Sequence, residues 1–239
     1  MRILFIVSAR GGSRGVPHKN IVVVGALPLI AYKIIAAKKC RYEHRIIVST
    51  DDEDIAEVAK KYGGEVPFMR PKELATATAS SMDVVAHAMD WIEDNDDKSY
   101  DYVCLLEPSS PFLSYLDIDA AIAEMERARA DTLLGVKEVE VSRNFIFPLD
   151  AQGKLSLLYH SIREMNSVRR QDQPKEYTPN GCIYLAKWKY FKAQKLFHSE
   201  NSLAYIMPDE QSVEIDTPLD LIYARAIVAS GKLDLSMWS

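Results

Sequence analysis

Residues 3–20 read ILFIVSARGGSRGVPHKN, an apolar run followed at once by a glycine-rich, basic stretch. The apolar residues predict a buried strand. Because glycine has no Cβ atom, backbone N–H groups in the loop that follows can approach an anion closely. Arg10, Arg14 and Lys19 add positive charge to the same loop. The stretch therefore predicts a strand that leads into a polyphosphate-binding loop.

The spacing of the glycines disfavours two common nucleotide-binding loops. The P-loop pattern G-x-x-x-x-G-K-[ST] needs a Gly-Lys-Ser/Thr run, which the sequence lacks. The dinucleotide pattern G-x-G-x-x-G also fails, since the glycines stand at positions 11, 12 and 15. Neither a P-loop kinase nor a nicotinamide enzyme is therefore expected. A solvated basic turn is the remaining alternative to a phosphate site.

Length and composition bound the class of protein. A chain of 239 residues fits one large α/β domain, or one domain with an excursion. Its net charge of −5 gives no bulk attraction to nucleic acid or to an anionic membrane, so neither is expected as a partner. Few, widely spaced cysteines suit a reducing compartment, and no run approaches the ~20 apolar residues of a membrane span. Since the start of the sequence also lacks a signal-peptide pattern, we expect a cytoplasmic protein.

Short apolar runs alternate with helical periodicity along most of the chain. Strands are predicted at 3–9, 46–48, 102–106, 132–136, 182–186 and 213–216, and helices at 29–37, 52–62, 80–92, 117–129 and from 217. Such alternation implies an α/β fold, a mostly parallel sheet with helices on both faces. In such sheets ligands bind at the carboxyl ends of the strands. The loops at 10–20, 49–51 and 107–111 are therefore expected to meet at one site.

The alternation lapses between residues 139 and 179. This segment is too apolar for a disordered insert, yet its second half is rich in arginine. We interpret it as a β-rich excursion, either a subdomain or an arm that reaches a partner subunit. Residues 1–138 and 180–239 then form the core domain.

Several short motifs, in order over nearly the whole chain, resemble one family. They are ARGGSRGVPHKN at 9–20, VSTD at 48–51, RPKELA at 70–75, TASS at 78–81, LLEPSSP at 105–111, RRQD at 169–172, NGCIY at 180–184 and IDTP at 215–218. Together they resemble the CMP-sialic acid synthetases (acylneuraminate cytidylyltransferases). The resemblance implies the nucleotide-diphospho-sugar transferase fold and a reaction in which CTP and a nonulosonic sugar acid give CMP-sugar and pyrophosphate. It also implies Mg²⁺ and a homodimer in which the 139–179 arm reaches into the neighbour's active site.

By this resemblance, one set of residues binds the nucleotide: Arg10, Gly11, Gly12, Ser13, Arg14, Lys19, Asn20, Arg70 and Ser81. Arg10, Lys19 and Asp216 are the residues expected to act in catalysis. An arginine fork grips two phosphate oxygens, whereas Lys19 acts as a point charge. Arg14 stands where the family usually has lysine, which keeps the charge and changes the reach.

A second set is expected at the sugar: Glu107, Ser109, Ser110, Arg170, Asn180, Gly181 and Tyr184. By the resemblance, Arg170 comes from the partner's arm and holds the sugar carboxylate. Glu107 stands where the family often has glutamine. A carboxylate that faces another at about 4 Å is repelled by about 4 kcal/mol at an effective dielectric of ~20. Glu107 therefore either reads an amine or hydroxyl of a different sugar, the interpretation we favour, or joins the coordination of Mg²⁺.

The expected Mg²⁺ ligands are Asp216 and Glu214. The family usually carries Asp-Ile-Asp at this place, and here the sequence is Glu-Ile-Asp at 214–216. Alternate residues of a strand project on one face, and Mg²⁺ takes one or two carboxylates plus phosphates and water. Because glutamate is one methylene longer, Glu214 binds through water or from a shifted position, or simply solvates an edge strand. The sequence shows no dedicated general base.

Three alternatives stay open. Within the same chemistry the substrate is legionaminate, pseudaminate, deaminated neuraminate or octulosonate, with octulosonate last because its enzymes have a different first loop. A second alternative is a non-catalytic nucleotide-binding regulator, which the altered Glu107 and Glu214 favour. The third is a glycosyltransferase, which would hold its metal through Asp-x-Asp where this chain has Glu-Pro-Ser at 107–109.

Overall fold

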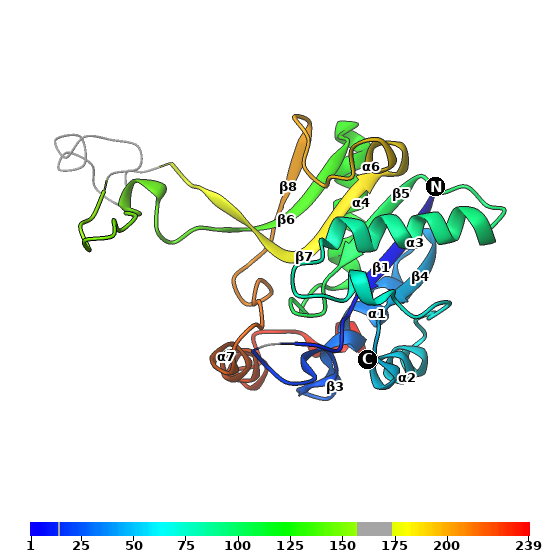
Figure 1. Cartoon of the computed structure of the whole chain (residues 1–239), viewed down its shortest axis with the longest axis horizontal. Helices are drawn as coiled ribbons and strands as arrows, with labels where there is room; N and C mark the ends of the chain where they lie inside the picture. Colours follow the sequence, from blue (N-terminus) through cyan, green and yellow to red (C-terminus); the bar gives the residue numbers. More distant parts are fainter. Residues whose placement is uncertain (14, 157–173) are drawn as a thin grey trace. The chain divides into compact units, whose positions relative to one another are not determined.

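The computed structural model describes residues 1–13, 15–156 and 174–239, drawn in colour in Figure 1. The chain divides into two compact units. The first comprises Met1–Val136 and Pro179–Ser239, and the second comprises Lys137–Thr178. Arg14 and Arg170, which the sequence assigns to the nucleotide and the sugar, lie outside the described residues.

The described residues form a six-stranded sheet in the order β4-β1-β5-β7-β6-β8. The strands are β1 (Arg2–Ser8), β4 (Glu43–Ser49), β5 (Tyr102–Leu106), β6 (Thr132–Glu138), β7 (Tyr177–Lys187) and β8 (Ser202–Ile206). β1 pairs parallel with β4 and β5, and β6 pairs parallel with β8, whereas β7 runs antiparallel to β5. A separate two-stranded ribbon joins β2 (Val23–Val24) to β3 (Leu27–Pro28). The prediction of a mostly parallel α/β sheet is thus confirmed.

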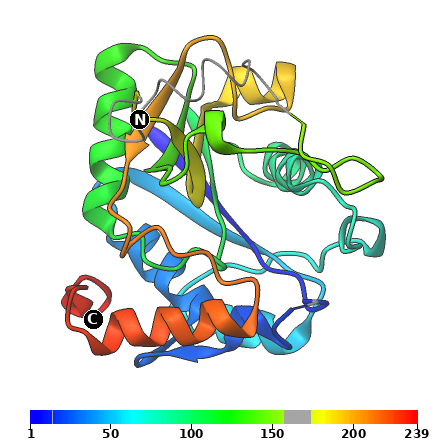
Figure 2. The same ribbon diagram turned by 90° about the vertical axis from the view of Figure 1, so that its left-hand side faces the viewer.

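Helices cover both faces of the sheet (Figures 1 and 2). They are α1 (Leu29–Lys39), α2 (Glu53–Tyr62), α3 (Ser81–Asn95), α4 (Tyr115–Ala128), α6 (Trp188–Gln194) and α7 (Pro218–Ala229). The strands supply two cores by simple alternation: Phe5 and Val7 pack in one cluster with α1 and α4, while Leu4 and Ile6 pack in the other with α3 and α6. Among the described residues, no helix combines the length and the apolar character needed to cross a bilayer.

Local capping signals fix several helix ends where the sequence predicts them. Asp52 is the N-cap of α2 and accepts a hydrogen bond from the Ile55 N–H, and Gly63 ends the helix with φ 100°. Thr217 and Asp220 form a reciprocal capping box at the start of α7, with proline in the first turn. These caps place the start of α7 directly after Asp216.

The predicted strand at 213–216 is wrong. Among the described residues the segment joins no sheet: beside the loop after β5 it makes a backbone bond from Ile215 N–H to the Ser109 carbonyl (2.8 Å) rather than a ladder. Val213 and Ile215 are nevertheless buried, and the residues that alternate with them are exposed. Glu214 and Asp216 therefore share one face, as the sequence predicts, without a strand.

The described residues of the second unit contain little regular structure apart from the ends of β6 and β7. The unit contains a 3-10 helix at Arg143–Phe145 and an isolated bridge between Leu149 and Leu155. Within it, Glu176 accepts a hydrogen bond from the Arg143 backbone N–H (2.8 Å). Residues 157–173 lie outside the described part, so the β-rich character and the dimerisation role assigned to 139–179 stay predictions.

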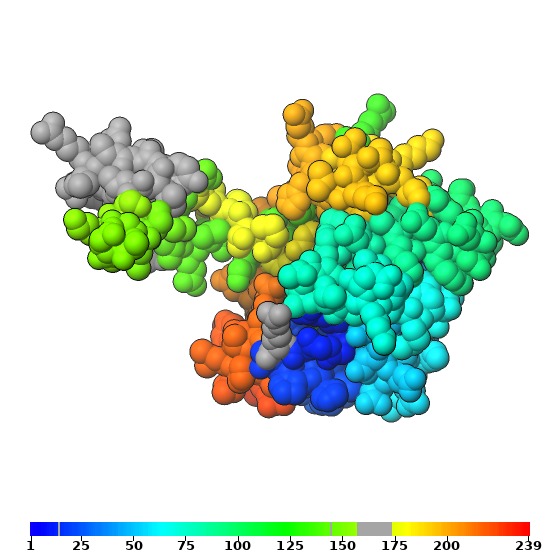
Figure 3. All heavy atoms as spheres, in the orientation of Figure 1, coloured from blue at the N-terminus to red at the C-terminus, as the bar shows by residue number. Residues whose placement is uncertain are grey.

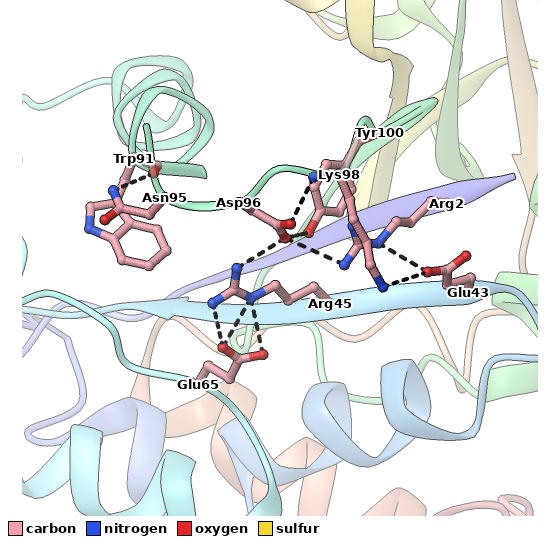
Figure 4. A network of polar contacts seen from close by, with 9 residues as sticks. All are labelled: Arg2, Glu43, Arg45, Glu65, Trp91, Asn95, Asp96, Lys98 and Tyr100. Carbon is pink, nitrogen blue, oxygen red and sulfur yellow. Dashed lines mark hydrogen bonds and ion pairs between the residues drawn. The ribbon is translucent and has the colours of Figure 1, made fainter. Parts of the chain in front are cut away.

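A polar network ties the amino end of the sheet to the loop after α3 (Figure 4). Asp96 accepts hydrogen bonds from Tyr100 Oη (2.7 Å), Arg45 Nη1 (3.1 Å) and Arg2 Nη2 (3.4 Å). These bonds, led by that from Tyr100, hold the pKa of Asp96 well below its ordinary value. Since Arg2 starts β1, this network stabilises the end of the sheet opposite to the carboxyl ends of the parallel strands.

Candidate active site

A cavity of about 400 Å³ opens in the first unit, at the carboxyl ends of β1 and β5. It is the place where ligands bind in sheets of this kind. The predicted site residues in its wall are Arg10, Ser13, Lys19, Asn20, Arg70, Ser81, Glu107, Ser109 and Asp216. The structure therefore brings most of the predicted nucleotide set, the predicted catalytic set and part of the sugar set to one cavity.

The loop after β1 is docked directly on the backbone of Asp216. A Cβ atom at Gly15 would come within 1.9 Å of the Asp216 carbonyl oxygen, so no side chain fits there. Lys19 Nζ donates to Asp216 Oδ1 at 2.8 Å. The Lys19 side chain is largely buried (16% exposed), whereas Asp216 is open to solvent (62%). The basic loop and the distal carboxylate thus meet on one wall of the cavity.

The first glycines of the loop face the end of β4 rather than the cavity. Asp51 Oδ1 accepts a hydrogen bond from the Gly11 N–H (3.0 Å), and a Cβ at Gly11 would lie 2.5 Å from Asp52 Oδ2. Gly12 has no atom within 4 Å of such a Cβ. Neither glycine lines the cavity, so their assignment to the nucleotide depends on the resemblance.

Arg10 is held from two sides. Its Nη1 donates to the Thr76 carbonyl (2.8 Å), and its own carbonyl accepts from Asn20 Nδ2 (2.9 Å). In the space-filling view the blue amino-terminal segment borders the teal segment that follows residue 70 (Figure 3). The Arg10 side chain therefore links the loop after β1 to the segment that leads into α3.

Arg70 is a buried cation at the rim of the sheet. It is 6% exposed, its Nε donates to Ser49 Oγ (3.0 Å), and its Nη2 donates to Ser8 Oγ (3.0 Å). Burial lowers the pKa of Arg70 to about 10, so the group keeps its charge at neutral pH. Serines at the ends of β1 and β4 fix this charge beside the cavity.

Three carboxylates lie in or beside the same cavity. Glu107 follows β5, and the bond from Ile215 N–H to Ser109 holds Glu214 and Asp216 beside it. Burial raises the pKa of the Glu107 carboxyl, and the Glu214 carboxylate raises it further. The charges of Lys33 and Lys19 act in the opposite direction. Glu107 is thus a carboxyl in the wall of the cavity whose charge depends on its neighbours.

Of the other predicted sugar residues, Arg170 lies outside the described part, and Ser110, Asn180, Gly181 and Tyr184 do not line the cavity. Ser110 is fully buried, and its Oγ has no hydrogen-bond partner among the described residues. Gly181 (φ 71°) faces it, because a Cβ there would lie 2.4 Å from Ser110 Oγ. Asn180 is 2% exposed and donates to Ser212 Oγ (2.9 Å). Tyr184 is half-buried against Phe197, as in the alternative that it belongs to the core.

Other residues of the site were not predicted from the sequence. Ser8, Thr76 and Ala79 line the cavity, and Lys33 lies buried on the sheet side of α1. The position of Ser8 at the end of the first strand could have identified it as a site residue. Lys33 could have been identified too, since it interrupts the apolar face of the helix predicted at 29–37.

The acidic residues suit a hard cation. Within the described ranges, no three His, Cys, Asp or Glu residues are grouped as a complete metal site. Mg²⁺ does not require one, because it binds through one or two carboxylates together with phosphate and water oxygens. Asp216 lines the cavity, and Glu214 is exposed on the same side of the 213–216 segment. This all-oxygen donor set fits Mg²⁺ bound jointly with a polyphosphate.

A basic loop and carboxylates at the carboxyl ends of a mostly parallel sheet are the arrangement found in α/β proteins that bind nucleotides. The chain belongs to the cytidylyltransferase family, because the sequence model described as "Cytidylyltransferase" matches residues 4–214.

Relatives with known names agree with this assignment. The chain is 34% identical over 229 residues to N-acylneuraminate cytidylyltransferase of Escherichia coli O18:K1:H7, covering 95% of this chain but 52% of that protein. It therefore spans about half the length of this relative. It is 33% identical over 221 residues to CMP-N,N'-diacetyllegionaminic acid synthase of Legionella pneumophila, covering 92% of this chain and 93% of that one. The structure of CMP:2-keto-3-deoxy-manno-octonic acid synthetase complexed with CTP shares the fold, with TM-score 0.65, 16% identity and coverage of 96% and 99%.

Proposed function

We propose that this protein transfers the cytidylyl group of CTP to a nonulosonic sugar acid and releases pyrophosphate. The observation that carries the proposal is the shared cavity lined by Arg10, Lys19, Arg70 and Asp216. The family membership and the names of the relatives supply the nucleotide and the class of sugar.

In this reaction the anomeric hydroxyl of the sugar attacks the α-phosphorus of CTP as the bond to pyrophosphate breaks. Both reactants are anions, so catalysis consists mainly of positioning and charge neutralisation. Arg10 and Arg70 offer planar guanidinium groups to phosphate oxygens, and Lys19 offers a point charge. Lys19 is already paired with Asp216 at 2.8 Å, so a bound triphosphate shares its ammonium with that carboxylate.

Mg²⁺ is the cofactor that the carboxylates support. Asp216, with Glu214 directly or through water, would hold the ion against the phosphates. The bound ion would neutralise charge on the triphosphate. Calorimetric titration of the protein and CTP with Mg²⁺, compared for the wild type and Asp216→Asn, tests this assignment through binding alone.

The sugar is a nonulosonate that offers a hydrogen-bond donor near Glu107. A carboxyl group in the cavity wall repels a second carboxylate but accepts from a hydroxyl, amine or amide N–H. The percentage identity does not indicate which sugar is the substrate. A relative named for acylneuraminate and one named for diacetyllegionaminate are 34% and 33% identical to this chain. A panel of nonulosonates, octulosonate included, would identify the substrate.

We also propose a cytoplasmic homodimer in which residues 139–179 of one subunit complete the site of the other. The support is the resemblance, in which this segment carries Arg170 toward the sugar carboxylate. Light scattering of the purified protein measures the oligomeric state, and a monomer at micromolar concentration would contradict the proposal.

A pyrophosphate-release assay tests the function. Purified protein, CTP and each sugar acid are combined with and without Mg²⁺, and Asp209→Asn serves as a control that removes a remote, exposed carboxylate. Pyrophosphate release with at least one nonulosonate, dependent on both substrates, is expected. CTP binding without release for any sugar would instead favour a non-catalytic regulator.

A further inference from the structure

Lys33 of α1 is a lysine with no exposure to solvent. Its Nζ donates one hydrogen bond, to the Cys182 carbonyl of β7 at 2.8 Å. An ammonium group has three donors and is strongly destabilised when it is buried without an opposite charge. The function of the cavity does not use Lys33 directly, so its burial calls for a physical reason.

A carboxyl group lies on the other side of the same stretch of β7. In the β5–β7 pairing Leu105 stands opposite Tyr184, and continuing this register places Glu107 opposite Cys182. A Cβ at Gly181 would lie 3.5 Å from Glu107 Oε2, so the carboxyl group rests against that glycine. The Gly181–Cys182 backbone therefore contacts Glu107 on one side and Lys33 on the other.

The two side chains approach this part of β7 from opposite faces of the sheet. Cys104 and Leu106 pack in the α1 cluster, while Val103 and Leu105 pack in the α3 cluster. Glu107 follows Val103 and Leu105 in the alternation of side chains, whereas Lys33 reaches β7 from α1. One layer of backbone separates the buried ammonium from the carboxyl group in the cavity wall.

The electrostatics agree with this placement. Burial lowers the pKa of Lys33, and negative charge at Cys182, Cys104, Glu107 or Asp117 opposes this shift. Burial raises the pKa of both thiols, so near neutral pH they are uncharged and the carboxylates of Glu107 and Asp117 are the opposing charges. Asp117 is already engaged in the α4 cap and accepts from Tyr205 Oη (3.1 Å). In return, Lys33 lowers the pKa of Glu107 against burial and the Glu214 carboxylate.

We propose that Lys33 is a positioning residue, the buried counter-charge that holds the Glu107 carboxylate in the cavity wall from the other side of the Gly181–Cys182 backbone. For its effect on the sugar, the proposal rests on the proposed function. It explains how a glutamate is accommodated beside Glu214 and Asp216, and it makes Glu107 an acceptor for a donor on the sugar. The competing explanation is that Lys33 only ties α1 to β7, independently of Glu107.

A double-mutant cycle on the full chain without ligands separates these explanations. Urea unfolding is measured for the wild type, Lys33→Met, Glu107→Gln and the double variant, with the exposed Lys38→Met of the same helix as control. Each single variant is expected to be less stable. The double variant is expected to be more stable than additivity predicts, with an unfolding equilibrium constant at least about fivefold below the additive value. Additivity within about twofold would overturn the proposal.

Glu107→Gln alone keeps the test decisive if Lys33→Met fails to fold. If Glu107 compensates Lys33, removing its charge destabilises the protein. If Glu107 is mainly repelled by Glu214, the same change stabilises it. A Glu107→Gln protein as stable as the wild type, or more stable, would therefore overturn the proposal.

The kinetics test the positioning role. Lys33→Met is expected to raise KM for the sugar acid about tenfold or more and to leave KM for CTP within about twofold. Adding Glu107→Gln should return the sugar KM to that of Glu107→Gln alone, whereas a purely structural lysine would give no such rescue. If no variant, nor the wild type, releases pyrophosphate, the proposed function fails while the unfolding cycle still decides on Lys33.

Discussion

Substituting alanine for Gly15 should disturb the site more than any other single-methyl change in the loop after β1. The new Cβ would lie 1.9 Å from the Asp216 carbonyl oxygen, and both atoms belong to, or are attached to, backbone. Contacts of this kind need at least about 3 Å, so the loop must move by about 1 Å. Overpacking of this kind costs about 1–3 kcal/mol. That corresponds to a Tm about 2–10 °C lower in a domain of this size.

Moving this loop is also expected to weaken the binding of the nucleotide. Lys19 and Asp216 are joined across this contact at 2.8 Å, so moving the loop separates the ammonium from the position that the triphosphate needs. A misplacement of about 1 Å can cost up to about 10²-fold in rate, and a loss of tenfold or more in CTP affinity is expected. Calorimetry measures the stability, and equilibrium titration measures the CTP affinity.

Gly12→Ala is the matched control for stability, because its Cβ would meet nothing within 4 Å. Its Tm should stay within about 1 °C of the wild type. If Gly15→Ala were as stable as Gly12→Ala and bound CTP like the wild type, the loop would not be docked on Asp216, and the reasoning would be refuted.

Three further changes test separate parts of the account. Asp216→Asn should reduce pyrophosphate release about 10²-fold or more with little change in Tm, and near-normal release would exclude Asp216 from the chemistry. Asp96→Asn should destabilise the protein by about 2–4 kcal/mol in urea, since it leaves buried donors of Arg2 and Tyr100 without their acceptor, whereas exposed Asp97→Asn should be neutral. Because the pKa of Asp96 is lowered on folding, its contribution is present above about pH 4 and is lost as the pH falls further, so the wild type and Asp96→Asn should converge in acid. Glu107→Gln should change the ranking of nonulosonates in the pyrophosphate assay, and an unchanged ranking would remove Glu107 from specificity.

The local parts of the fold were readable from sequence. Strand β5 coincides with the predicted 102–106, because five consecutive apolar residues are buried on both faces of a central strand. The ends of α2 follow from Asp52 and Gly63, whose capping geometry depends only on neighbouring residues. The meeting of the loops at 10–20 and 107–111 follows from the rule that parallel strands end at one edge of the sheet.

The misses depend on contacts distant in sequence. The segment 213–216 alternates like a strand, but a strand also needs a neighbouring strand, and within the described part of the chain the segment has a backbone bond to Ser109 instead of a ladder. β8 was not predicted because its residues are half-exposed or exposed, so the sequence has no apolar run that would indicate a strand. The counter-charge for Glu107 was missed because Lys33 stands 74 positions away in the sequence and is joined to it through β7.

The central claim is that the loop after β1 and Asp216 form the binding site for the triphosphate of CTP. Equilibrium titration of CTP in the presence of Mg²⁺, for the wild type and Lys19→Met, tests it most directly. Loss of one charge-assisted phosphate contact predicts a Kd about 10- to 100-fold higher for Lys19→Met. Equal affinities for CTP in the two folded proteins would contradict the claim.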